Sequence, residues 1–244
     1  MTPTIEERPS PNHGERAGGK PVDILLLHYT GMTSDESALK WLCDPQSAVS
    51  AHYFVFTDGR LAQLVAEDRR AWHAGLSSWA GEGDINSRSI GIEIANPGHR
   101  FGYRAFPDAQ IDAVIALCGD ILGRHPIPPR RVLAHSDVAP SRKEDPGELF
   151  PWHRLHEAGI GHWVPPDPIA AGPTLRRGDR GAAVAALGGR FREYGYQVEA
   201  GDDFDNALAA VVRAFQRHFR QERVDGTADP STVSTLHRLI AAPG

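Results

Sequence analysis

The sequence predicts an α/β domain with a mixed central sheet flanked by helices, followed by a small all-α domain of three helices. Apolar runs typical of strands alternate with helical patterns and one hairpin in the first two thirds of the chain, whereas the last third shows helical patterns only. A segment with four prolines separates the two parts, as is typical of an interdomain linker. We therefore expect an arm at 1–20, a first domain at 21–163, a linker at 164–174 and a second domain at 175–244.

Each element of the first domain has a local signal in the sequence. An unbroken apolar run is typical of a strand buried on both faces, and apolar residues three or four positions apart indicate a helix. Ser, Thr or Asp marks a helix start, and an Asp-Gly pair marks a hairpin turn. The expected elements are a strand at 22–27, a helix begun by a Thr33/Glu36 capping box, a hairpin at 52–65 around Asp58-Gly59, a strand at 89–95, a helix capped by Asp108, a strand at 131–135 and a polar loop at 136–151.

The second domain shows three amphipathic patterns, at 181–195, 205–219 and 230–241. Each places apolar residues at helical spacing, so we expect a three-helix bundle that buries one face of each helix.

The composition limits the class of protein. With 41% hydrophobic and 23% charged residues the chain is globular, and a net charge of −5 offers no electrostatic basis for binding nucleic acid. No apolar run reaches the ~18 residues of a membrane-spanning helix, so no membrane insertion is expected. Two cysteines, Cys43 and Cys118, are too few for a disulfide scaffold.

Two histidines and one aspartate have the composition of a catalytic metal site. His28 and His135 each end an apolar strand, and Asp145 follows His135 by ten residues. Ligands collect beyond the carboxyl ends of strands, so both imidazoles are expected to face one cleft. Two His and one carboxylate leave one tetrahedral position of zinc open for water. On spacing alone, the alternative is that each histidine is an ordinary hydrogen-bonded residue at a strand end.

Glu93 and Lys143 are the candidate catalytic residues. Glu93 shares one strand face with Gly91 and Ala95, where a carboxylate is costly unless it is paired or used. Beside a zinc site it would serve as a general base; the alternative is an ion pair with an arginine. Lys143, two residues before Asp145, would stabilise an oxyanion, or else is a solvated loop lysine.

Five ordered blocks resemble the zinc-dependent N-acetylmuramoyl-L-alanine amidases, whose fold is shared with peptidoglycan recognition proteins. They are LLLHYTGM, SAHYFVFTDG, AWHAGLSSWAG, SIGIEIAN and AHSDVAPSRKEDPG, within about residues 20–160. The resemblance implies zinc ligands at His28, His135 and Asp145, a catalytic glutamate at Glu93 and a catalytic lysine at Lys143. It also implies that the AWHAG loop lies beside the substrate, so that His73 and Trp79 line the groove.

The last third of the chain resembles the three-helix peptidoglycan-binding domain through Leu175 to Gly181, Gly195-Tyr196, Ala214 to Gln216 and Asp225-Gly226. Together the two resemblances imply a hydrolase that cleaves the amide between the lactyl group and L-alanine, with peptidoglycan or anhydromuropeptides as its partner. The alternative is a non-catalytic peptidoglycan recognition protein on the same fold. The second domain is expected to bind polymer and to be dispensable for the chemistry.

The location is predicted from the first twenty residues. They show neither the apolar core of a signal peptide nor a cysteine to lipidate, so we expect a cytoplasmic enzyme that recycles cell-wall fragments. A periplasmic location is the alternative if the natural chain begins further upstream.

Overall fold

The computed structural model of this chain describes residues 4–19 and 21–243. Its centre is a six-stranded sheet in the order β1-β5-β4-β7-β3-β8. The pair β4–β5 is antiparallel and the other neighbours are parallel, so the mixed sheet and its hairpin are confirmed. The strands are β1 (Ile5–Glu7), β3 (Ile24–Tyr29), β4 (Tyr53–Val55), β5 (Leu61–Gln63), β7 (Ser89–Ile94) and β8 (Val132–Ala134); β2 (His13–Glu15) and β6 (Arg69–Ala71) form a separate antiparallel pair.

Seven α-helices accompany the sheet within the described residues. Three of them lie in the last third of the chain, as its apolar spacing predicts. They are α1 (Asp35–Leu42), α2 (Asp108–Arg124), α3 (His135–Val138), α4 (Trp152–Glu157), α5 (Ala182–Tyr194), α6 (Asn206–Phe219) and α7 (Pro230–Ala241), with short 3-10 turns at Ala17–Gly19, Ile85–Ser87, His99–Phe101 and Pro129–Arg131.

The alternation of side chains along β3 and β7 divides the sheet into two different faces. Leu25 and Leu27 of β3 pack with the isoleucines of β7 beneath the apolar side of α2. Ile24, Leu26 and His28 point to the opposite face because successive strand residues alternate. That opposite face therefore carries the chemistry-bearing side chains.

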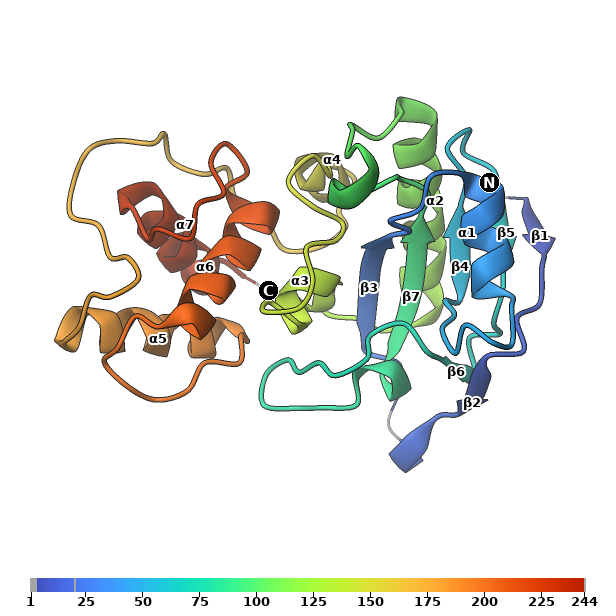
Figure 1. The fold of residues 1–244 in the computed structure, drawn as a ribbon, viewed down its shortest axis with the longest axis horizontal. Helices are drawn as coiled ribbons and strands as arrows, with labels where there is room; N and C mark the ends of the chain where they lie inside the picture. Colours follow the sequence, from blue (N-terminus) through green and yellow to red (C-terminus); the bar gives the residue numbers. More distant parts are fainter. Residues whose placement is uncertain (1–3, 20, 244) are drawn as a thin grey trace.

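Helix α1 and the group of C-terminal helices both lie on this opposite face. At one end of the sheet, α1 packs on β4 and β5 through an apolar cluster that includes Ala38, Leu42 and Phe54. At the other end, the C-terminal helices lie next to α3, on the side of the edge strand β8 (Figure 1). The candidate site lies between α1 and the C-terminal helices.

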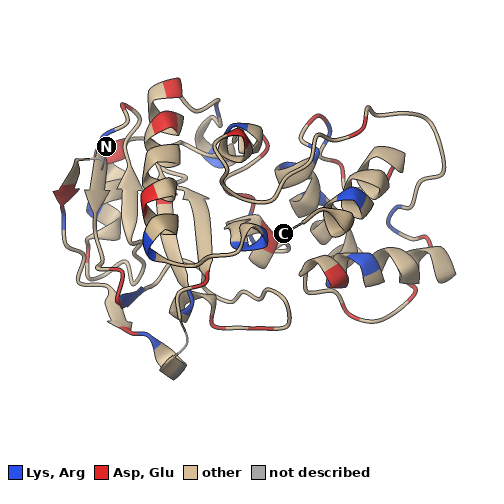
Figure 2. Cartoon of the chain, turned by 180° about the vertical axis from the view of Figure 1, so that it is seen from behind, with Lys and Arg blue, Asp and Glu red and all other residues tan. Residues whose placement is uncertain are grey.

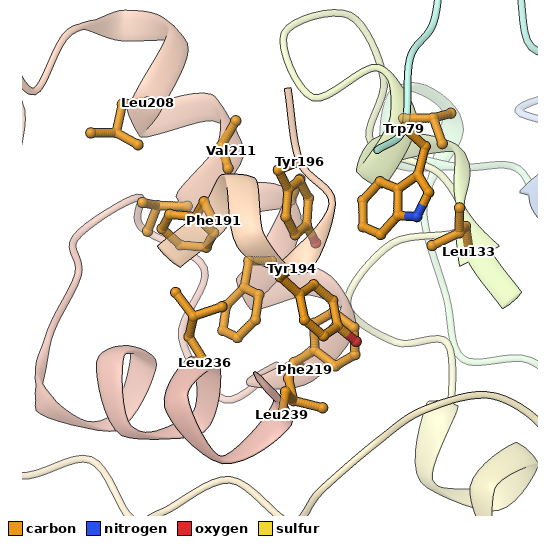
Figure 3. Packing of buried hydrophobic residues seen from close by; sticks show 14 of the residues in the cluster. Trp79, Leu133, Phe191, Tyr194, Tyr196, Leu208, Val211, Phe219, Leu236 and Leu239 are labelled. Atoms are coloured by element: carbon orange, nitrogen blue, oxygen red, sulfur yellow. The ribbon is translucent and has the colours of Figure 1, made fainter. Parts of the chain in front are cut away.

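The two parts of the chain share one apolar core. Ile24, Leu26, Trp79 and Leu133 of the first part are buried together with α5, α6 and α7 residues. Figure 3 shows Trp79 between Leu133 and Tyr196, which follows α5. The segment 164–174 contains no helix or strand. The C-terminal helices are thus packed directly on the first part of the chain.

Several expected boundaries differ from the structure. The first helix is capped by Ser34, whose hydroxyl accepts the Ser37 N–H, and not by Thr33. Asp108 is the first residue of α2 and makes no capping hydrogen bond; it pairs with Arg154 instead. The loop expected at 136–151 begins with the helical turn α3. Local pattern places a helix but not its terminal hydrogen bonds, which depend on neighbouring segments.

Charged residues of both signs occur in both parts of the chain, whose net charge is only −5. Figure 2 shows acidic and basic residues interspersed along the helices of both parts of the chain. Among the described residues, every helix is too short or too polar to cross a bilayer.

Candidate active site

His28, His135 and Asp145 converge although they come from three different elements. His28 lies near the end of β3, His135 begins α3, and Asp145 lies in the loop that follows α3. The Nδ1 atoms of the two histidines are 2.8 Å apart, and each lies 3.0 Å from Oδ2 of Asp145. All three side chains are buried. The two strand-end histidines therefore do face one point.

This triangle fits a metal ion better than a hydrogen-bonded cluster. If both Nδ1 atoms donate to Asp145, neither can accept from the other, so the 2.8 Å contact between His28 and His135 cannot also be a hydrogen bond. Ligands of a tetrahedral zinc at ~2.0–2.1 Å stand about 3.3 Å apart, close to the three observed separations. The donor set of two imidazoles and one carboxylate has the composition of a catalytic zinc site.

The protonation states also suit a metal. Burial, and next the charge of His135, lowers the pKa of His28 to about 4. Burial acts to raise the pKa of Asp145, but the adjacent imidazoles His135 and His28 outweigh it and hold that pKa below its usual range. A neutral imidazole and an ionised carboxylate are the forms that coordinate metals.

The remaining ring nitrogens of both histidines have fixed partners. Nε2 of His28 lies 3.0 Å from Nδ1 of His73, and Nε2 of His135 lies 3.1 Å from the Ala74 carbonyl oxygen. His73 in turn reaches Ser89 Oγ at 3.2 Å. Such outer partners orient metal ligands and set their tautomers. His73, expected beside the substrate, thus contacts a predicted ligand, and it also lines the cavity in front of the cluster.

The close approach of His73 to the sheet requires a glycine. A Cβ atom on Gly91 of β7 would lie 2.6 Å from the His73 ring. Gly91 therefore leaves the space in which His73 reaches His28, and the motif SIGIE has a packing reason at its third position.

Glu93 lies on β7 directly opposite His28 of β3 in the parallel register. Its Oε2 atom is buried and has no hydrogen-bond partner among the described residues. Burial, and next the charge of Asp145, raises the pKa of Glu93 well above its usual range, while Lys143 opposes that rise. Such an unpaired carboxylate beside a ligand cluster is suited to proton transfer.

A cavity of about 900 Å³ opens in front of the cluster. Glu93, His135 and Lys143 are among the residues that line it, which brings the predicted catalytic lysine to the same space as the predicted base. Two helices that are distant in the sequence also supply its walls, with Trp41 of α1 and Arg217 of α6. Trp41 is 48% exposed.

The sequence did not identify these wall residues. Trp41 fits the apolar spacing of α1 and Arg217 is one of many arginines, so neither has a local signal that separates it from its neighbours. Only the approach of α1 and α6 to the same opening reveals them.

The structure corrects the expectation for Trp79. Its side chain is 2% exposed and lies in the core shared with the C-terminal helices, and it is not among the residues that line the cavity. The aromatic rings of Tyr194 and Tyr196 surround it edge-on at 6.1 and 5.0 Å. Its physical role is packing, because a large aromatic side chain at this position joins two apolar surfaces.

Comparison with known protein families matches both parts of the chain. The model of the N-acetylmuramoyl-L-alanine amidase family matches residues 18–148, and a peptidoglycan binding domain model matches residues 180–236. Together they cover the predicted metal ligands, helices α5 and α6, and the first part of α7.

Individual relatives are similar over most of their length. The chain is 38% identical to N-acetylmuramoyl-L-alanine amidase AmiD of Escherichia coli strain K12 over 235 residues, which are 91% of this chain and 84% of the relative. It is 33% identical to 1,6-anhydro-N-acetylmuramyl-L-alanine amidase AmpD of Enterobacter cloacae, over 61% of this chain and 86% of that protein.

Solved structures of two relatives resemble this fold. E. coli AmiD in complex with the substrate anhydro-N-acetylmuramic acid-L-Ala-D-gamma-Glu-L-Lys superposes with a TM-score of 0.78 at 37% identity, covering 93% of this chain and 91% of the other. AMPDH3 of Pseudomonas aeruginosa in complex with anhydromuramic pentapeptide gives a TM-score of 0.76 at 37% identity, covering 91% and 92%.

Proposed function

Because this chain belongs to the N-acetylmuramoyl-L-alanine amidase family, we propose that it hydrolyses the lactyl–L-alanine amide of anhydromuropeptides in the cavity in front of His28, His135 and Asp145. The convergence of these three buried side chains at 2.8–3.0 Å is the observation that carries the proposal. Two similar enzymes have been solved with anhydromuramoyl peptides bound. Such a ligand is therefore the first substrate to test.

His28, His135 and Asp145 would hold a zinc ion. Zinc in a site with three protein ligands is a Lewis acid that polarises a carbonyl group and acidifies water. The chain itself supplies the two imidazoles and the ionised carboxylate. The contacts of His28 with His73 and of His135 with the Ala74 carbonyl would keep both Nδ1 atoms directed at the point where the three donors converge.

Glu93 would move the proton in this reaction. Its unpartnered Oε2 adjoins the cavity beside His135. There it accepts a proton from the attacking water and later delivers it to the leaving nitrogen of L-alanine. Its raised pKa favours holding the proton between the two steps.

Lys143 would stabilise the negative charge that develops on the carbonyl oxygen. Its ammonium group adjoins the same cavity and carries a charge that acts on both Glu93 and His28. A fixed positive charge in a site that excludes water stabilises an oxyanion more than it stabilises the neutral substrate.

The test is mass spectrometry of products after incubation with an anhydromuropeptide and, separately, with intact sacculi. We expect a free anhydro-sugar and a peptide with a free L-alanine amine, and we expect a chelator to stop the reaction until zinc is restored. Binding of the muropeptide without cleavage by zinc-loaded protein would contradict the proposal and support a recognition protein. The cytoplasmic location stays a prediction, which fractionation of the native organism tests.

A further inference from the structure

Asp137 is a buried carboxylate that joins the two parts of the chain. It lies on α3, and its side chain is 0% exposed. Oδ1 accepts a hydrogen bond of 2.6 Å from the Tyr196 hydroxyl, and Oδ2 accepts one of 2.7 Å from Nδ1 of His218. Both donors belong to the C-terminal helical region. A buried carboxylate depends on such donors, because it has lost its water.

The same carboxylate fixes the start of α3. Oδ2 of Asp137 also accepts the backbone N–H of Ala134 at 2.8 Å, immediately before His135 begins the helix. The next residue, Ser136, donates its N–H to the carbonyl oxygen of Asp145 at 3.0 Å. Two of the three predicted metal ligands, His135 and Asp145, are therefore held by this one helical turn.

The two donors are themselves held by packing against aromatic rings. The centroid of the His218 ring lies 3.7 Å from that of Trp152 of α4 and 3.8 Å from that of Phe219. The interplanar angles are 24° and 8°, so His218 is stacked on both rings. Tyr196 packs against Trp79 with ring centroids 5.0 Å apart. Neither donor can turn away from Asp137 without disturbing this packing.

A second contact joins α6 to the loop that carries Lys143 and Asp145. The guanidinium of Arg217 on α6 pairs with Glu144 at 3.1 Å. In the sequence, Glu144 lies between Lys143 and Asp145, the two predicted site residues of this loop. The C-terminal helices therefore contact both the helical turn of His135 and the loop of Asp145.

We propose that Tyr196 and His218 are positioning residues for the amidase reaction, and that through Asp137 they hold His135 and Asp145 in the geometry that binds the metal. This inference rests on the proposed function. The residues following the linker would then be needed for the chemistry itself, in addition to any binding of polymer. They would act on the spacing of the ligands, without touching the substrate.

Tyr194 supplies a matched control for Tyr196. Both tyrosines are buried, both pack edge-on against Trp79, and both hydroxyls hydrogen-bond to a residue outside the C-terminal helices. The Tyr194 hydroxyl contacts Nδ1 of His162 at 2.9 Å and, among the described residues, makes no hydrogen bond to Asp137. Tyr196→Phe and Tyr194→Phe each remove one hydroxyl from the same interface, but only the first loosens Asp137.

The experiment measures zinc affinity by competition with a chromophoric chelator, and kcat and KM on an anhydromuropeptide, in the full chain. For Tyr196→Phe we expect zinc affinity and kcat to fall about fivefold or more, with KM changed less than about twofold. For Tyr194→Phe we expect changes below about twofold in all three. Thermal unfolding of both variants checks that each is folded, and His218→Gln provides a second route to the same loss.

The proposal would be overturned if Tyr196→Phe and His218→Gln bound zinc as tightly as the control variant Tyr194→Phe. Zinc affinity is measured without turnover, so this result differs from failure of the proposed function, in which zinc binds normally and no muropeptide is cleaved.

Discussion

The indole ring of Trp79 lies against the backbone of Gly195, where a Cβ atom would come within 2.6 Å of the ring. The N–H of Ala80, the residue after Trp79, donates to the Gly195 carbonyl oxygen at 2.7 Å. The glycine ends α5 with a φ of 137°. A loop of the first part of the chain is thereby closed tightly onto the C-terminal helices.

This contact predicts that Gly195→Ala lowers the free energy of unfolding. The added methyl group must displace Trp79, and alanine must adopt an unfavourable φ. We expect the displaced packing to lower the free energy of unfolding by about 1–3 kcal/mol, in addition to the backbone strain. Gly178→Ala is the matched control, because its φ is 97° but a Cβ there meets nothing within 4 Å. Urea unfolding followed by circular dichroism measures both; equal losses would show that the Trp79 contact tolerates a methyl group.

Glu93→Gln is expected to reduce turnover about 10²–10⁴-fold, because the amide cannot accept a proton from water. Zinc content should stay at the wild-type level, since Glu93 is not one of the three converging ligands. Product release is followed by chromatography and metal content by mass spectrometry. Near-normal turnover with zinc retained would remove Glu93 from the mechanism.

Lys143→Met is expected to lower kcat by about 10²–10³-fold through loss of oxyanion stabilisation, with a smaller effect on KM. Lys40→Met is a suitable control, because Lys40 is exposed on α1 and does not line the cavity. Steady-state kinetics on an anhydromuropeptide distinguish the two variants. A loss confined to KM would assign Lys143 to substrate binding instead.

The lowered pKa of the buried His52 predicts that the protein is less stable in acid. Burial, and next the charge of Arg16, lowers the pKa of His52 to about 3, while the ring accepts the Gly91 N–H at 2.9 Å in its neutral form. Below the unfolded-state pKa of about 6.5 the unfolded chain binds the extra proton, so stability falls as pH falls from about 6.5 towards 3.

The expected loss attributable to this group is at most about 1.4 kcal/mol per pH unit. His52→Gln should show a shallower decline than the wild type between pH 6.5 and 4, measured by urea unfolding at each pH. Parallel curves for the two proteins would mean that His52 does not control acid stability.

Removal of the residues beyond 163 is expected to abolish turnover of small muropeptides. The sequence led to the expectation that the chemistry survives this truncation. The shared core around Trp79 and Leu133, and the hydrogen bonds to Asp137, now favour the opposite outcome. Activity of a well-folded truncated chain on small muropeptides would restore the original expectation.

Much of the candidate site could be predicted from the sequence because its parts have local signals. The apolar runs ending at His28 and near His135 indicate strand ends, and alternation along SIGIEIA places Glu93 away from the isoleucines. A parallel sheet brings such strand ends to one edge, so the meeting of His28, His135 and Glu93 followed from periodicity of two and from fold class.

Only the tertiary structure decided what surrounds that site. Trp79 sits in a motif that suggests a substrate loop, yet it is buried, and nothing near Tyr196 in the sequence marks it as a partner of Asp137, 59 residues earlier. Trp41 and Arg217 meet one cavity from helices at opposite ends of the chain. Local periodicity determines which face of an element is apolar, but the free energy of burying two such faces together selects which elements meet, and that choice placed the C-terminal helices beside His135.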